Sequence, residues 1–378
     1  MTQAGIYVHI PFCRSRCSYC DFATGLYQTE LAARYVELVV KEIETTNLTK
    51  SVLDVDTIYF GGGTPSMLTP LQLQKILQAI RTRFGVDESA EVTLEMNPGT
   101  ISPEILQEFR SRGVNRASFG AQTFDDAELA RLGRSHTVAD TFKTFSDLRL
   151  AGFDNVSFDL IAGLPGQSIE RWRCNVEEAL RLRPEHLSFY LLEVHAGTPL
   201  AEHIRRGLQP VPDEDLAAEM YAWMLERAEV AGYQHYEISN LSLPGFTSRH
   251  NIKYWTGAPY LGFGCSAHSY DGHGRRWANE RAIEKYMRAI ETGGSPVVQE
   301  QHLTDTDIRS EAIFLGMRLM RGVDTKCYQD SFGIDLRESH KGELNRFIDA
   351  GLVEFDGDIV RLTRAGALMS NEVFTAFI

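Results

Sequence analysis

The strongest constraint on the fold is a repeated alternation of short apolar runs and amphipathic stretches in the first 210 residues. Runs rich in β-branched and aromatic residues, each typical of a buried strand, occur at 6–10, 56–60, 91–96, 116–122, 155–163 and 186–194. Stretches with helical periodicity lie between them. Six β-then-α units in succession predict an α/β fold with a parallel sheet, either an open doubly wound sheet or a partial barrel.

Two of the predicted helices carry clear start signals. Thr69 is expected as an N-cap with Pro70 at the first helical position. Ser102 and Pro103 repeat this pattern, and Gly113 marks the end of that helix. These signals support crossover helices between the strands.

The alternation ends after residue 210. A long amphipathic helix is predicted at 213–231, and an aromatic, glycine-rich stretch follows at 246–277. We interpret residues 211–294 as a cap on a domain formed by residues 1–210. Residues 295–378 predict helices followed by a small β-wing, a winged-helix-like α+β domain.

Composition limits the class of function. The chain has 378 residues, a formal net charge of -13 and a pI near 5.4, which argues against a broad nucleic-acid surface. The C-terminal domain is therefore expected to have a structural or partner-docking role. No cationic leader or long apolar run is present, and the 6 cysteines do not suggest a disulfide framework. We expect a cytoplasmic protein with reduced thiols and no transmembrane segment.

Three of those cysteines stand together. The stretch HIPFCRSRCSYCDF places Cys13, Cys17 and Cys20 within eight residues, whereas the others lie at 174, 265 and 327. Three thiolates from one loop can bind three irons of a 4Fe-4S cluster and leave the fourth iron open. The alternative is a zinc site completed by His9 or by a distant cysteine.

Polar residues recur near the ends of the predicted strands. A glycine run, GGGTP at 61–65, follows the second strand and lets backbone amides approach a ligand closely. Glu95 and Gln122 end the third and fourth strands, and Asp159 lies in the fifth. Each of these side chains alone is explained as a buried polar group with its partners satisfied. Together they indicate a site at the C-terminal edge of a barrel.

The C-x3-C-x2-C motif of Cys13, Cys17 and Cys20, with Tyr19 before the last cysteine, resembles the radical S-adenosylmethionine (SAM) superfamily. The resemblance implies that the open iron chelates SAM, and that an electron from the cluster cleaves a carbon–sulfur bond to give a 5'-deoxyadenosyl radical. It also implies a full or partial TIM-type barrel. We therefore expect a partial (β/α)6 barrel.

Further segments narrow the resemblance. YVHIPFCRSRCSYCDF, FGGGTPS, FGAQTFD, LGRSH and DLIAGLPGQ are together similar to the group that holds oxygen-independent coproporphyrinogen III oxidases and HemW-type haem chaperones. The resemblance implies that SAM is bound by Tyr7, Tyr19, Gly62, Gly63, Thr64, Glu95, Gln122, Arg134 and Asp159.

Two departures separate the oxidases from this chain. The oxidases carry an N-terminal extension and a further cysteine beyond the triplet, whereas here five residues precede IYVHI and the corresponding position is Phe22. In RHNIKYW, the residues His250, Asn251, Tyr254 and Trp255 match the HNxxYW signature of HemW-type proteins, which is linked there to haem binding.

A haem site needs an axial donor and an apolar envelope, and His250, Tyr254 and Trp255 supply both residue types. The alternative is that this segment packs the cap onto the barrel, with His250 bonded to backbone. His268 and His273 are further axial candidates, and His235 is expected to be structural. Arg249, Arg275 and Arg276 are expected to form ion pairs with the haem propionates.

These observations favour a cytoplasmic haem chaperone with a 4Fe-4S cluster, SAM and haem, which passes haem to respiratory haem proteins. Its expected partners include an electron donor to the cluster and, peripherally, membrane proteins. The alternative is a coproporphyrinogen III oxidase that uses Tyr7 beside the radical. A third class, radical modification of RNA or protein, lacks a recognisable accessory domain here.

Overall fold

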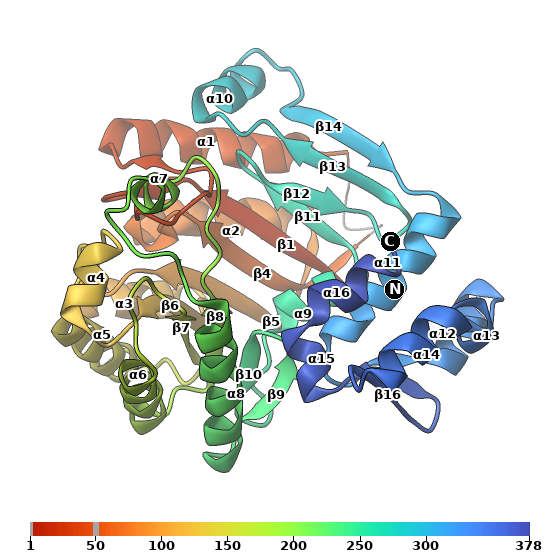
Figure 1. Ribbon diagram of the computed structural model, residues 1–378. Helices are drawn as coiled ribbons and strands as arrows, with labels where there is room; N and C mark the ends of the chain where they lie inside the picture. The colour runs from red at the N-terminus through yellow and green to blue at the C-terminus, as the bar shows by residue number, and fades with distance from the viewer. Residues whose placement is uncertain (1–2, 48–52) are drawn as a thin grey trace.

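The structure is a computed structural model that describes residues 3–47 and 53–378. Within these residues, the six predicted strands form one parallel sheet in the order β1-β4-β5-β6-β7-β8 (Figure 1). Their bounds are β1 Gln3–Ile10, β4 Asp54–Gly62, β5 Gly85–Met96, β6 Arg116–Gln122, β7 Val156–Ala162 and β8 His186–Leu191. The sheet runs from β14 at one end to β9 at the other without closing, which confirms a partial barrel.

The crossover helices follow the strands as predicted. Thr69 and Gln72 form a reciprocal capping box at the start of one helix, and the Ser102 hydroxyl accepts from the amide of Ile105 at the start of the next. The helices of this region are α1 Thr29–Thr45, η1 Pro65–Met67, α2 Pro70–Arg83, α3 Pro103–Ser111, α4 Asp126–Arg131, α5 Val138–Leu150, α6 Ile169–Leu182 and α7 Pro199–Arg205.

The strands divide their side chains between two faces. In β1, Ile6, Val8 and Ile10 are buried in the main hydrophobic core together with helix residues. The residues between them, Tyr7 and His9, alternate to the other face because a strand has a period of two. The sheet therefore has an apolar face against the helices and a polar face inside the barrel.

Residues 211–294, interpreted as a cap, add strands to both edges of this sheet. The elements are α8 Glu214–Val230, β9 Gln234–Glu237, β10 Asn240–Ser242, α9 Arg249–Trp255, β11 Tyr260–Phe263, β12 His268–Tyr270, β13 Arg275–Asn279 and α10 Ile283–Glu291. Strand β10 pairs with β8, whereas β11 pairs parallel to β1. Strand β14, Val297–His302, continues the second edge beyond β13. The predicted boundaries at 210 and 294 stay predictions.

The C-terminal residues have a hydrophobic core of their own, which includes Ile313, Tyr328, Phe347 and Val360. The elements are α11 Asp305–Arg318, β15 Val323–Asp324, α12 Thr325–Phe332, α13 Leu336–Ser339, α14 Lys341–Asp349, β16 Val353–Asp356, β17 Ile359–Leu362, α15 Arg364–Leu368 and α16 Ser370–Thr375. The small sheet β15-β17-β16 is the predicted wing.

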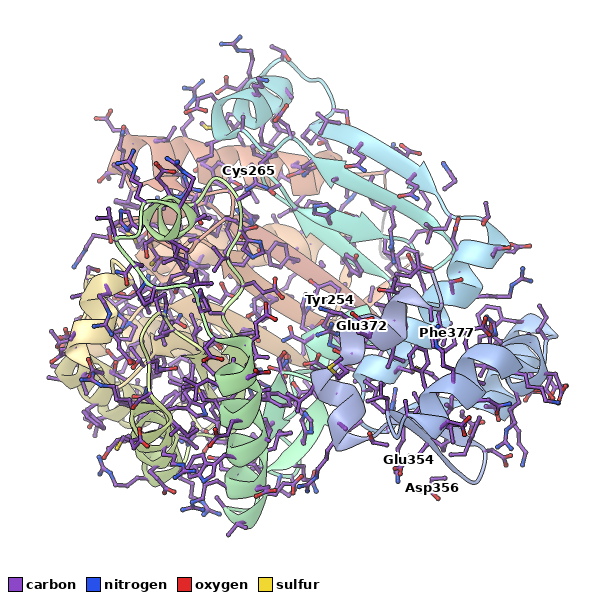
Figure 2. The ribbon with its side chains drawn as sticks, viewed as in Figure 1. Tyr254, Cys265, Glu354, Asp356, Glu372 and Phe377 are labelled. Atoms are coloured by element: carbon purple, nitrogen blue, oxygen red, sulfur yellow. The ribbon has the colours of Figure 1, made fainter. Side chains whose placement is uncertain are left out.

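The wing carries acidic side chains that pair with an arginine. Figure 2 shows Glu354 and Asp356 on the wing, and both carboxylates pair with Arg361. The pairing leaves no excess positive charge from these three residues. No helix within residues 3–47 and 53–378 combines the length and apolar character that a membrane span requires.

Candidate cofactor site

The three clustered cysteines lie on the loop that leaves β1, partly exposed and free of disulfides. Two short strands, β2 Phe12–Cys13 and β3 Gly25–Leu26, pair with each other at the two ends of this loop. The amide of Ser18 donates to the carbonyl of Leu132 at 2.9 Å, which fixes the middle of the loop to the end of α4. Local pairing and one long-range bond therefore hold the thiols in place.

These cysteines open onto a cavity of about 410 Å³ at the C-terminal edge of the parallel strands. Seven of the nine residues predicted to bind SAM line the same cavity: Tyr19, Gly62, Gly63, Glu95, Gln122, Arg134 and Asp159. Because they come from different strands and loops, only the barrel brings them together. Their role in binding SAM stays a prediction.

Glu95 is the most tightly held carboxylate of this cavity. Tyr59 donates its hydroxyl to Oε1 at 2.7 Å, and the amide of Gly62 donates to Oε2 at 3.1 Å. Burial raises the pKa of Glu95 to about 7. Burial also raises the pKa of the nearby Asp159 carboxyl. Two carboxyl groups with raised pKa values suit a ligand that brings an amino group or hydroxyl groups.

Backbone geometry explains two of the predicted positions. Gly62 has φ 111, and a Cβ there would lie 2.5 Å from the His9 ring, so a side chain is excluded. Gln122 ends β6 with φ 64, a left-handed conformation that non-glycine residues rarely adopt. Such strain is concentrated at ligand sites, where the surrounding structure maintains it.

Two hydrogen-bond donors reach the thiols. The Thr64 hydroxyl lies 3.7 Å from Sγ of Cys13, and Nη1 of Arg134 lies 3.4 Å from Sγ of Cys17. Asn97 joins these donors, because its Nδ2 donates to the Thr64 hydroxyl at 2.8 Å and its Oδ1 accepts from Arg134 at 2.6 Å. Donors directed at sulfur stabilise the negative charge of an iron–sulfur cluster.

Asn97 is a site residue that our sequence reasoning missed. It follows β5 directly and lines the cavity, so it lies at the same edge as Glu95 and Asp159. Its position in the sequence could have identified it. Polar residues that directly follow parallel strands lie at one edge of the sheet, and Asn97 directly follows a predicted strand.

A cluster and a single ion require different spacing of the thiols. Within residues 3–47 and 53–378, no three His, Cys, Asp or Glu side chains gather closely enough to hold one metal ion. A cubane spreads its three cysteine ligands over three irons, whereas zinc needs its ligands at one point. Burial raises the pKa of the Cys13 thiol to about 11, so iron binding would displace its proton.

Tyr7 and Thr64, the other two predicted SAM residues, do not line the cavity. The Thr64 hydroxyl is instead directed at Sγ of Cys13, as described above. The Tyr7 hydroxyl is 3.1 Å from Nδ1 of His9, whose Nε2 donates to the carbonyl of Ala23 at 2.9 Å. Burial lowers the pKa of His9 to about 4, so its imidazole is neutral and Nδ1 accepts from Tyr7. In this conformation Tyr7 contacts protein groups around the cluster loop.

The segment predicted to bind haem forms α9, and its histidine is enclosed. His250 is 1% exposed; its Nδ1 lies 2.9 Å from the Thr57 hydroxyl and its Nε2 lies 3.0 Å from the Tyr254 hydroxyl. The ring also stacks on Tyr59 at 5.2 Å. Burial lowers the pKa of His250 to about 3. Both ring nitrogens are therefore engaged, so the predicted ligation of iron requires one of these contacts to open.

The remaining haem candidates lie on the sheet extension. His268 and His273 are exposed, on β12 and in the following turn, and Nε2 of His235 lies 3.2 Å from the carbonyl of Ile238. The three arginines predicted for propionates are each held by a carboxylate: Arg249 by Asp56 at 3.1 Å, Arg275 by Glu300 at 2.9 Å and Arg276 by Glu311 at 2.6 Å.

Comparison with known proteins agrees with this geometry. Residues 7–179 match the family model of the radical SAM superfamily, and residues 303–369 match that of the HemN C-terminal domain. The solved structure of coproporphyrinogen III oxidase (HemN) from Escherichia coli covers 100% of this chain and 90% of its own, with a TM-score of 0.86 and 22% identity. That likeness establishes the fold.

The proteins that are similar in sequence identify the family more narrowly than the fold does. The haem chaperone HemW of Lactococcus lactis is 36% identical over 98% of this chain and 96% of its own length. HemW of Bacillus subtilis is also 36% identical, over 98% of both chains. A mitochondrial radical S-adenosyl methionine domain-containing protein 1 from Mus musculus is 35% identical over 87% of this chain and 76% of its own. This chain belongs to the HemW family of the radical SAM superfamily.

Proposed function

We propose that this protein is a haem chaperone that binds a 4Fe-4S cluster, SAM and haem, and delivers haem to respiratory haem proteins. The observation that carries the proposal is the near full-length similarity to proteins named haem chaperone HemW. The convergence of three thiols and seven predicted SAM residues on one cavity supports the two cofactors.

In this proposal, Cys13, Cys17 and Cys20 hold the cluster, and the bound cluster would supply the electron for cleavage of a carbon–sulfur bond of SAM. Arg134 and the pair Thr64–Asn97 direct donors at two of the thiols. Glu95 and Asp159 face the same cavity as acceptors for the amino or ribose hydroxyl groups of SAM.

Haem would be bound through the HNxxYW segment. Trp255 is only partly buried, whereas His250 is enclosed by Thr57 and Tyr254. We assign Trp255 to contact with the macrocycle, because a large aromatic ring buries much apolar area. The protein would act in the cytoplasm, accept an electron for the cluster from a reductase, and meet its acceptors at the membrane surface.

The test compares haem handling with turnover. Purified full-length protein, reconstituted anaerobically, is titrated with haem and then mixed with an apo-haem protein as acceptor. We expect a Soret band at stoichiometric haem and its transfer to the acceptor. A protein that binds no haem, yet converts coproporphyrinogen III anaerobically with SAM and a reductant, would establish the oxidase alternative instead.

A further inference from the structure

A second large cavity lies where the barrel meets the C-terminal domain. Its volume is about 460 Å³, within the range of small-molecule sites. One wall is Trp255 at the end of α9 and Tyr270 on β12, and the opposite wall is Leu315 on α11 with Tyr328 and Phe332 on α12. The α9 and α11 helices contact each other there, and Figure 2 shows Tyr254 of α9 in this region. Aromatic side chains from both parts suit a flat ligand, although the Arg318 guanidinium lies 4.2 Å over the Trp255 ring and the carboxyl groups of Glu311 and Asp324 also line the cavity.

The cavity has a free cation at its rim. Arg321 lines it and is exposed, and no carboxylate among the described residues pairs with it. The three arginines predicted for propionates are all engaged in ion pairs, as shown above. Because a guanidinium group binds a carboxylate in a fork of two hydrogen bonds, Arg321 is suited to an anionic substituent of the ligand.

Unpartnered polar groups lie in the same walls. Tyr328 is 4% exposed, and its hydroxyl has no hydrogen-bond partner among the described residues. The indole N–H of Trp255 is also buried without a partner there. Both atoms have almost no accessible surface, so a ligand in the cavity reaches them only if these side chains rotate. Because buried polar groups are nearly always paired, such a rotation would satisfy them.

The cavity also contains a potential iron donor. Cys327 lines it as a free, exposed thiol on the first turns of α12. No histidine lines this cavity. His250 lies elsewhere in the motif with both ring nitrogens engaged. Tyr270 and Tyr328 also line the cavity, but both are buried whereas Cys327 is exposed. The neighbouring Asp324 carboxyl raises the pKa of the Cys327 thiol, so iron would have to displace its proton.

We propose that this cavity is the haem site, with the macrocycle between Trp255 and the C-terminal domain, Arg321 on a propionate and Cys327 as the axial ligand. The inference rests on the proposed haem-chaperone function and specifies its site. On binding, the Cys327 thiol releases its proton to water as the sulfur–iron bond forms, and the oxidation state of the iron does not change. His250 then acts as a positioning residue that anchors α9.

The first test separates the iron ligand from the rest of the site. The full chain is titrated with haem and with iron-free protoporphyrin IX, for the wild type, Cys327→Ser and the exposed-cysteine control Cys174→Ser. We expect Cys327→Ser to shift the Soret band and weaken haem roughly tenfold, while protoporphyrin binding is unchanged. Cys174→Ser should match the wild type for both ligands.

The second test addresses the propionate. Arg321→Ala should weaken haem and protoporphyrin alike by roughly tenfold, and Arg321→Lys should restore part of that loss. Haem spectra and affinities that stay at wild-type values in Cys327→Ser and Arg321→Ala would overturn the site while leaving the chaperone function standing. A wild-type protein that binds no haem at all would instead overturn the proposed function. A Soret shift in His250→Ala with none in Cys327→Ser would return the axial role to His250.

Discussion

The cluster cavity and the HNxxYW helix both contact the inner face of the barrel, but their polar side chains are used differently. At the cavity, Gln122 and Asp159 face open volume. In α9, the His250 ring is hydrogen-bonded to the Tyr254 hydroxyl through Nε2 and to the Thr57 hydroxyl through Nδ1. The comparison teaches that a chemically suggestive motif supports a ligand site where its polar groups border open volume, and not where protein groups enclose them on every side.

One residue connects the two regions. Tyr59 donates its hydroxyl to Glu95 in the cavity, and its ring stacks on His250 in α9. Thr57 and Tyr59 are two positions apart on β4, so they share the inner face of the barrel. Gly5 lies beside them, and a Cβ there would be 3.0 Å from Cε1 of His250. The α9 helix therefore closes one end of the barrel interior, and the cofactor cavity lies at the other.

The largest effect is expected at the thiols. Cys13→Ala, Cys17→Ala or Cys20→Ala should each abolish the charge-transfer absorption of the reconstituted cluster, because each thiol binds one iron. Cys174→Ala, Cys265→Ala and Cys327→Ala serve as controls and should retain it. Absorption spectra and iron content give the measurement. Zinc without iron after anaerobic reconstitution would refute the cluster.

The next effect concerns the carboxylates of the cavity. Glu95→Ala and Asp159→Ala should each weaken SAM binding about tenfold or more while the cluster absorption stays intact, because each removes an acceptor for the ligand. Calorimetry on the reconstituted protein measures the affinity. If both variants bind SAM as the wild type does, the cavity is not the SAM site.

A smaller effect tests whether His250 is a neutral packing residue. The pKa of His250 is lowered from 6.5 to about 3 in the folded protein. As the pH falls below about 6.5, the imidazole therefore takes up a proton in the unfolded chain but not in the folded one, and the free energy of unfolding decreases. Between pH 7.5 and 5, the wild type should lose about 2 kcal/mol of unfolding free energy relative to His250→Gln. Denaturant unfolding at both pH values measures this difference. Parallel pH profiles of the two proteins would argue that His250 is not buried in neutral form.

The smallest effect concerns Asn97. Asn97→Ala removes the group that orients Thr64 and Arg134 toward the thiols, so the cluster should become harder to reduce, with a midpoint potential lower by on the order of tens of millivolts. Potentiometric titration followed by electron paramagnetic resonance gives the value. Asn97→Asp retains the acceptor for Arg134 but adds a negative charge beside the cluster, so its potential should also lie below that of the wild type. A potential unchanged in Asn97→Ala would show that this network does not tune the cluster.

Much of the fold was predictable because its signals are local. The strand at 56–60 and the cap at Thr69 depend on residues close in the chain, and both are observed, as β4 and the capping box of α2. The strand-end rule placed Glu95 and Asp159 at one edge for the same reason. Residues 211–294 were less predictable, because strand β11 pairs with β1 across more than two hundred residues and no local signal specifies that pairing.

The sequence by itself determined the chemistry available to this protein: three thiols on one loop, carboxyl and amide groups after successive strands, and a helix that carries His250, Tyr254 and Trp255. Only the tertiary structure decided which of these groups line a cavity and which are enclosed by other side chains. Side-chain availability depends on neighbours that are distant in the chain, as Thr57 is from His250. Burial in that contact lowers the pKa of the imidazole and occupies its nitrogens, whereas the barrel edge leaves the carboxyl groups of Glu95 and Asp159 facing a cavity.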